Sequence, residues 1–208
     1  MTERQRYGDP FAGIPGRRLF VAVPLPGDAA AAVVGLVDGV RGQGLPTGMH
    51  DVRWVRLDGL HLTLRFLGPT PDDRIEPTAQ AVRLVAARTT PIDALIAGTG
   101  TFPAGPRPRT LFLDLTEGAG PLADLTADLG TALLEAGWPA EARPFRAHLT
   151  LARSDGLAAG PLVAGRLADG LGSRTIPVRI DAIGLFESLT GGGPARYLPI
   201  EVAALTGS

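Results

Sequence analysis

Three residue types are missing from the 208-residue chain, which contains no cysteine, no lysine and no asparagine. Without cysteine there can be no thiolate nucleophile, iron–sulfur cluster, disulfide framework or cysteine-based zinc site. Without lysine there can be no Schiff base, no Walker A phosphate loop and no lysyl adenylate of the kind that nucleotide-activated ligases form. The absences therefore exclude much of covalent and nucleotide-activated catalysis.

The chain also lacks an excess of charge of either sign. Its 20 basic residues, all arginine, stand against 21 acidic residues, and the formal net charge is −1. Non-specific binding to duplex nucleic acid depends on neutralising many phosphates, so this balance argues against it, while a small anionic site remains compatible. No apolar run approaches the roughly 20 residues that span a bilayer, and residues 1–18 contain no apolar signal segment. We expect a cytoplasmic protein with no membrane partner.

The length and the 45% hydrophobic content suffice for one domain with a buried core. Residues 1–16 mix charge, glycine and proline without a period, and we predict a flexible N-terminal tail there, followed by a single bilobal domain over 17–208. Strands are predicted over 19–25, around 54–55, and over 60–68, 92–100, 109–115, 145–153, 174–188 and 195–205. Helices are predicted over 28–43 with Asp28 as the N-cap, and over 72–88, 120–136 and 161–169. This irregular alternation favours an α+β fold.

A tetrapeptide occurs twice in the chain, as His61-Leu62-Thr63-Leu64 and as 148–151 with the same four residue types. These two copies hold two of the three histidines. Each copy follows a comparable run of strand, helix and turn, which indicates a duplication into two lobes. Side chains two apart in a strand share a face, so each lobe presents one imidazole and one hydroxyl on the face opposite its leucines.

Two imidazoles that face one site can cleave a phosphodiester without a metal. The neutral ring takes a proton from the nucleophile, and the protonated ring gives one to the leaving oxygen. Both forms coexist near neutrality because the ordinary histidine pKa is about 6.5. The threonine hydroxyls would donate hydrogen bonds to the non-bridging phosphate oxygens. No G-x-S-x-G motif and no histidine pair with metal-ligand spacing competes with this interpretation.

At these residues the sequence resembles the two-histidine phosphoesterase superfamily, and within it the bacterial and archaeal RNA 2′,3′-cyclic phosphodiesterases, also called 2′-5′ RNA ligases. The resemblance covers 17–202 and includes RRLFVAVPLP, LHLTLRFLG, RPFRAHLTLAR and the closing YLP. It implies two pseudo-symmetric α+β lobes whose antiparallel sheets line a central cleft, with helices packed outside. The implied reaction is hydrolysis of a terminal 2′,3′-cyclic phosphate to a 2′-phosphate, with no cofactor and no metal.

The resemblance also implies residue roles. His61 resembles the proton donor to the departing 3′ oxygen and His148 the base that activates water. Thr63 and Thr150 match phosphate-binding threonines, and Arg153 matches a phosphate-contacting arginine. Ala147 stands where relatives often have proline.

Two arginines pose opposite problems of strand parity. Arg153 has the wrong parity to join His148 and Thr150, so it reaches the site only if the strand ends or bulges first. Arg65 shares the parity of His61 and Thr63, so it is a candidate ligand for the phosphate or for the next nucleotide. Trp54 is more readily explained by core packing than by base stacking.

The partners expected are RNA with a 2′,3′-cyclic phosphate end or a small cyclic nucleotide, with the chain acting as a monomer. A reverse, ATP-independent 2′-5′ ligation follows from microscopic reversibility. Two alternatives remain: a phosphodiesterase for another small cyclic or 2′-5′ linked nucleotide, and a non-catalytic module that binds RNA ends.

Overall fold

The computed structural model describes residues 15–49, 52–154, 158–190 and 194–207. Within these residues the strands are β1 (Arg17–Pro24), β2 (Val52–Trp54), β3 (His61–Thr70), β4 (Ile92–Phe102), β5 (Thr110–Glu117), β6 (His148–Ser154), β7 (Ile176–Ile180), β8 (Ala182–Leu189) and β9 (Arg196–Ala204). The helices are α1 (Gly27–Gly42), α2 (Ile75–Arg88), α3 (Ala119–Glu135) and α4 (Ala159–Leu171), with short 3-10 turns at Leu57–Gly59 and Asp72–Arg74. The predicted α+β class is confirmed. The tail predicted over 1–16 lies almost entirely outside the described residues.

The strand order has an internal pseudo-twofold symmetry. The antiparallel sheet runs β7-β4-β5-β6-β3-β1-β8-β9, and β2 pairs with the free part of β6. Exchanging β3 with β6, β1 with β5, β8 with β4 and β9 with β7 gives the same order read from the opposite edge of the sheet. The unit β1-α1-β3-α2 therefore corresponds to β5-α3-β6-α4, and a pseudo-twofold axis passes between β3 and β6.

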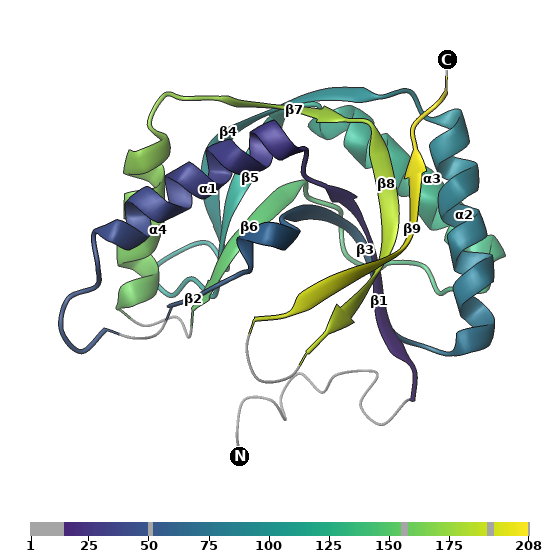
Figure 1. The fold of residues 1–208 in the computed structure, drawn as a ribbon, viewed down its shortest axis with the longest axis horizontal. Helices are drawn as coiled ribbons and strands as arrows, with labels where there is room; N and C mark the ends of the chain where they lie inside the picture. The colour runs from purple at the N-terminus through teal and green to yellow at the C-terminus, as the bar shows by residue number, and fades with distance from the viewer. Residues whose placement is uncertain (1–14, 50–51, 155–157, 191–193, 208) are drawn as a thin grey trace.

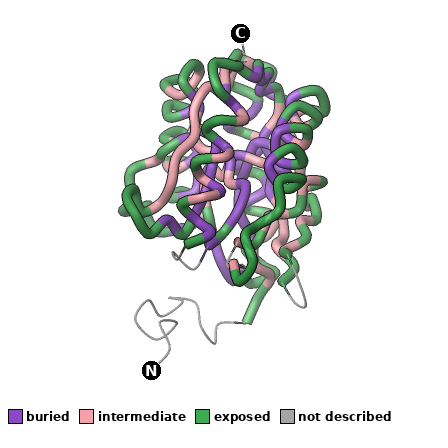
Figure 2. Tube along the Cα trace, turned by 90° about the vertical axis from the view of Figure 1, so that its left-hand side faces the viewer, coloured by how far each residue is buried: buried purple, intermediate pink, exposed green. Residues whose placement is uncertain are grey.

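The helices obey the same symmetry and cover the outer face of the curled sheet. α1 packs against α4 over one half, and α2 packs against α3 over the other. In Figure 2 the buried stretches of the chain gather in the interior, and the exposed stretches lie around them. The core is one contiguous cluster that includes Leu62, Leu64, Leu149 and Leu151. This burial fixes which face each tetrapeptide turns away from the helices.

Two details of the sequence prediction are wrong. The N-cap of α1 is Pro26, not Asp28; Asp28 lies in the first turn, where its Oδ1 accepts a hydrogen bond from the Ala29 N–H at 2.8 Å. The strand predicted over 174–188 is two strands that break at Asp181. β7 pairs with β4 in one half of the sheet, and β8 pairs with β1 in the other half. The apolar segment 174–188 therefore crosses from one half to the other.

Among the residues described, no helix is long and apolar enough to cross a membrane. The cytoplasmic location stays a prediction. His50 and the 191–193 loop lie outside the described residues.

Candidate active site

The two repeated tetrapeptides meet where the halves of the sheet join. β3 and β6 pair antiparallel through Leu62 and Leu149, both fully buried. In an antiparallel register this pair puts His61 opposite Thr150, and Thr63 opposite His148. The two histidines then occupy diagonal positions, which are typically about 7–8 Å apart, with their Cβ atoms somewhat closer. The structure thus brings together the four residues that the sequence predicted.

Both imidazoles are oriented by the same backbone contact. The Nδ1 of His61 is 2.7 Å from the carbonyl oxygen of Gly59, and the Nδ1 of His148 is 2.7 Å from the carbonyl oxygen of Arg146. A carbonyl only accepts, so each Nδ1 carries the hydrogen and donates it. Each Nε2 is left to accept a proton in the neutral ring, or to donate one in the protonated ring.

His61 is the more enclosed of the two rings. Its centroid lies 4.9 Å from that of Phe20 and 4.8 Å from that of Tyr197. Burial lowers the pKa of His61, with a further lowering from the charge of His148 and an opposing effect from the Gly59 carbonyl. Gly59 is required at this place, because a Cβ on it would lie 2.9 Å from the Tyr197 ring.

His148 rests against a different aromatic pair. The centroids of Phe102 and Phe112 each lie 5.1 Å from that of the imidazole. The guanidinium of Arg146 stacks over both phenyl rings and also pairs with Asp114 at 2.6 Å. These contacts hold the segment whose carbonyl orients His148.

A β-bulge lies at the fourth residue of each tetrapeptide. Between β5 and β6 the partner of Leu111 is Ala152 and that of Phe112 is Thr150, so Leu151 is the extra residue. Between β1 and β3 the extra residue is Leu64. A bulge shifts the alternation by one residue. The condition that the sequence set for Arg153 is therefore met, and this residue lies on the cleft face.

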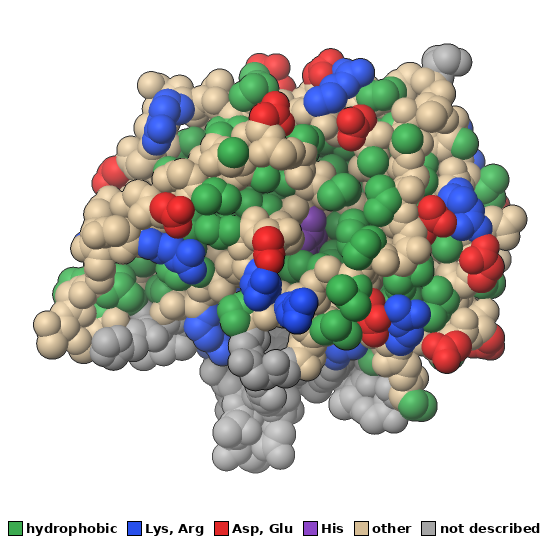
Figure 3. All heavy atoms as spheres, viewed as in Figure 1, with side chains coloured by type: hydrophobic (Ala, Val, Ile, Leu, Met, Phe, Trp, Pro, Cys, Tyr) green, Lys and Arg blue, Asp and Glu red, His purple; other side chains and the backbone are tan. Residues whose placement is uncertain are grey.

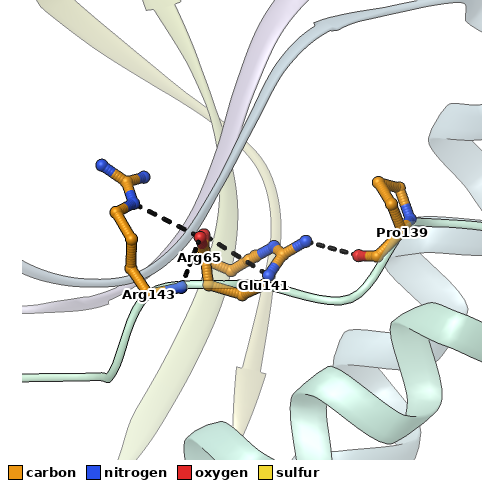
Figure 4. Close-up of polar contacts among 4 residues, drawn as sticks. All are labelled: Arg65, Pro139, Glu141 and Arg143. Atoms are coloured by element: carbon orange, nitrogen blue, oxygen red, sulfur yellow. Dashed lines mark hydrogen bonds and ion pairs between the residues drawn. The ribbon is translucent and has the colours of Figure 1, made fainter.

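The same shift moves Arg65 away from the expected position. Its alternation with His61 is broken at Leu64, and it lines no part of the cavity that contains His61. Its guanidinium donates a hydrogen bond to the Pro139 carbonyl at 2.6 Å and lies 3.4 Å from Glu141, which also contacts Arg143 (Figure 4). Strand parity therefore does not place Arg65 in the cavity of His61, and its role as a ligand for the phosphate or the next nucleotide stays a prediction.

A cavity of about 790 Å³ opens in front of His61. Both threonines and Arg153 line it, and Arg153 donates a hydrogen bond to the Thr110 hydroxyl at 2.8 Å. Its remaining charged lining is also basic, with no acidic side chain among the described lining residues; it consists of Arg41, Arg53 and Arg56. In Figure 3 a histidine side chain is visible near the centre of one face, with arginine side chains below it. The cavity is suited to a small phosphorylated ligand.

Sequence reasoning missed the aromatic side chains that enclose the imidazoles and the arginines of 41–56. The aromatic residues come from strands distant in sequence and become neighbours only through pairing. Trp54, for which the sequence favours core packing, packs against the core and also lines this cavity, with the guanidinium of Arg41 5.3 Å from its ring centroid.

The chain is similar to known proteins in both sequence and fold. The sequence model of a family described as the 2′-5′ RNA ligase superfamily matches residues 28–192. An RNA 2′,3′-cyclic phosphodiesterase of Aeropyrum pernix is 30% identical over 172 residues, which cover 81% of this chain and 93% of that protein. Another from Geobacillus stearothermophilus is 35% identical over 134 residues, or 64% of this chain and 41% of that protein. The chain thus spans less than half the length of the second relative.

Among solved structures, protein TT0787 of Thermus thermophilus superposes with a TM-score of 0.70 at 29% identity. The match covers 91% of this chain and 98% of that structure. The sheet and helices described above are therefore arranged as in that protein.

Proposed function

The chain belongs to the 2′-5′ RNA ligase superfamily, and we propose that it hydrolyses terminal 2′,3′-cyclic phosphates of RNA to 2′-phosphates through an acid–base pair formed by His61 and His148. The observation that carries this proposal is the pair of imidazoles with fixed Nδ1–H donors, one from each half of the sheet. Relatives named as RNA 2′,3′-cyclic phosphodiesterases support the substrate. Both histidines belong to one chain, so a monomer contains the whole pair.

In this mechanism His148 accepts the proton of the attacking water and His61 donates a proton to the departing 3′ oxygen. Each group contributes about 10²–10⁴-fold by general acid–base catalysis. Burial lowers the pKa of His61 in the free protein, which favours the neutral ring. A bound phosphate places a negative charge beside that ring and favours the protonated form that an acid requires.

Three further side chains would stabilise the charge on the phosphate. Thr63 and Thr150 lie beside the opposite histidine and would donate to the non-bridging oxygens. Arg153 would neutralise the same oxygens, and its hydrogen bond to Thr110 holds it at the wall of the cavity. The reverse step, attack by an RNA 5′-hydroxyl in place of water, uses the same groups and consumes no ATP.

Turnover of a nucleoside 2′,3′-cyclic monophosphate and of a short RNA with that end, measured in EDTA, tests the function. We expect both to give only the 2′-phosphate. A folded protein that binds these compounds without turnover would instead be a binding module. Turnover confined to another cyclic or 2′-5′ linked nucleotide would favour the alternative phosphodiesterase.

The order of acid and base is tested with bis(p-nitrophenyl) phosphate, whose leaving group needs no proton. His61→Ala should keep most of its activity on this ester, because only the departing oxygen loses its donor. His148→Ala should lose activity on this ester and on the cyclic nucleotide alike. The opposite pattern would reverse the two roles.

A further inference from the structure

A second cavity, of about 1120 Å³, opens on the other side of the histidine pair. Its walls are one face of α3 and the segment 140–146, and its inner end is formed by His148 and Thr63. The first cavity contains His61 and lacks His148, whereas the second contains His148 and lacks His61. Each imidazole therefore serves a cavity of its own.

The pseudo-twofold axis relates these two cavities. The first is built from the end of α1 and the segment that follows it, with Thr150 and Arg153 contributed by the opposite strand. The second is built from α3 and the segment that follows it, with Thr63 and Phe66 contributed by the opposite strand, and these two residues line both cavities. Phe66 is the second residue after the bulge at Leu64, and Arg153 is the second residue after the bulge at Leu151, so the two positions correspond. The duplication has thus produced two subsites, one on each side of the position proposed for the phosphate.

The chemistry of the second cavity suits a nucleoside followed by phosphates. Two aromatic side chains of its lining, Phe66 and Phe145, can stack on a base. Three arginines, at 65, 143 and 146, line it together with the acid Glu141. Of these, Arg65 pairs with Glu141 and Arg146 pairs with Asp114. The Arg143 side chain is 81% exposed, so it can still approach a phosphate while it contacts Glu141.

We propose that this second cavity binds the nucleoside that supplies a 5′-oxygen to the phosphate, so that the two cavities together hold the two sides of a 2′-5′ linkage. The proposal rests on the proposed function and on its order of acid and base. The ribose of the cyclic phosphate lies on the side of the leaving oxygen and of His61, in the first cavity. The attacking hydroxyl must then approach from the side of His148, where the second cavity opens.

The atoms balance without a further reactant. The 5′-hydroxyl oxygen forms a bond to phosphorus, the bond from phosphorus to O3′ breaks, and the product is a 2′-5′ diester with a free 3′-hydroxyl. His148 takes the hydroxyl proton on Nε2, and His61 gives its Nε2 proton to O3′. Cleavage of a 2′-5′ linkage to the cyclic phosphate is the same step in reverse.

The occupant can be tested by filling the second cavity from α3. Gly130 lies in its wall, and no atom lies within 4 Å of a Cβ added there, so Gly130→Leu extends into the space. Gly165 on α4 is equally open and lines neither cavity, which makes Gly165→Leu the matched control. Arg143→Gln, a change at an exposed position, provides a second variant should leucine at 130 impair folding.

The measurement is a partition ratio taken in one reaction. A nucleoside 2′,3′-cyclic monophosphate is the donor, and water competes with a dinucleotide bearing a 5′-hydroxyl or, separately, with methanol. For Gly130→Leu we expect the ratio of 2′-5′ product to 2′-phosphate to fall at least tenfold, equivalent to about 1.4 kcal/mol of lost binding. Methanolysis and hydrolysis should stay at the level of the control. Arg143→Gln should lower transfer to the dinucleotide in the same selective way.

Several results would overturn the proposal. The first is a partition ratio for Gly130→Leu equal to that of Gly165→Leu. The second is an equal loss of transfer to methanol and to the dinucleotide. The third is a loss confined to the hydrolysis of long donor RNAs, which would place the donor in this cavity. A wild type that hydrolyses the donor but transfers it no better to the dinucleotide than to methanol would also overturn it, leaving the proposed function intact. Failure of the wild type to hydrolyse the donor would refute the proposed function itself.

Discussion

The contact between Gly100 and Phe112 gives a sharp test of how His148 is held in place. The two residues are cross-strand partners in β4 and β5, and a Cβ on Gly100 would lie 2.4 Å from two atoms of the fully buried ring. An ordinary contact begins near 3.4 Å, so Gly100→Ala requires a movement of 1.0 Å, the difference between 3.4 and 2.4. Overpacking of this kind costs about 1–3 kcal/mol. In a protein of this size each kcal/mol lowers the midpoint of thermal unfolding by about 2–4 °C.

The same movement should reach the chemistry, because the Phe112 ring packs on His148. A misplacement of roughly 1 Å in a catalytic group can lower kcat by about 10²-fold. Gly98→Ala on the same strand is the control, since its Cβ would lie 3.5 Å from the nearest side-chain atom and should cost little. Phe112→Leu added to Gly100→Ala should restore part of both losses. Thermal unfolding and cyclic-nucleotide turnover that are the same for Gly100→Ala and Gly98→Ala would refute this reasoning.

Three further predictions concern single contacts in or beside the site. Because burial lowers the pKa of His61, the limb of the pH profile of kcat/KM that reports His61 should lie below the ordinary histidine range. In Tyr197→Ala the imidazole is opened to water, so this limb should move to higher pH. Movement to lower pH would contradict this explanation. Arg65→Met removes the contacts to Pro139 and Glu141 and should loosen this segment, so transfer to a dinucleotide should fall more than hydrolysis does. A large rise in KM for the cyclic nucleotide itself would instead indicate that Arg65 is a phosphate ligand. Thr110→Val removes the hydroxyl that orients Arg153, so KM should rise several-fold with little change in kcat, and an unchanged KM would show that Arg153 needs no such support.

The sequence was sufficient for the features that depend on local periodicity. Alternation in the two tetrapeptides correctly placed the leucines in the core and the histidines on the opposite face. The repeat itself indicated two related halves, and the strand order has the matching pseudo-twofold symmetry. These predictions succeeded because the identity and spacing of nearby residues determine them.

The features that depend on pairing between distant strands were less accessible. The bulges at Leu64 and Leu151 arise from register against β1 and β5. They take Arg65 out of the alternation with His61 and bring Arg153 onto the cleft face. Only the possibility of such a bulge could be stated from the sequence. The break at Asp181 was missed because the run 174–188 is apolar on both sides of it, although its two parts pair with different halves. Nothing in the local pattern identifies Tyr197 or Phe112 as neighbours of a histidine.

The most direct test of the account is the kcat/KM of His61→Ala, His148→Ala and the double variant on a nucleoside 2′,3′-cyclic monophosphate in EDTA. Groups that act as one acid–base unit are not additive. Each single change should therefore cost about 10²–10⁴-fold, and the double variant should be close to the more damaged single variant. A folded single variant that keeps more than about a tenth of the activity, a loss far below that range, would contradict catalysis by the pair.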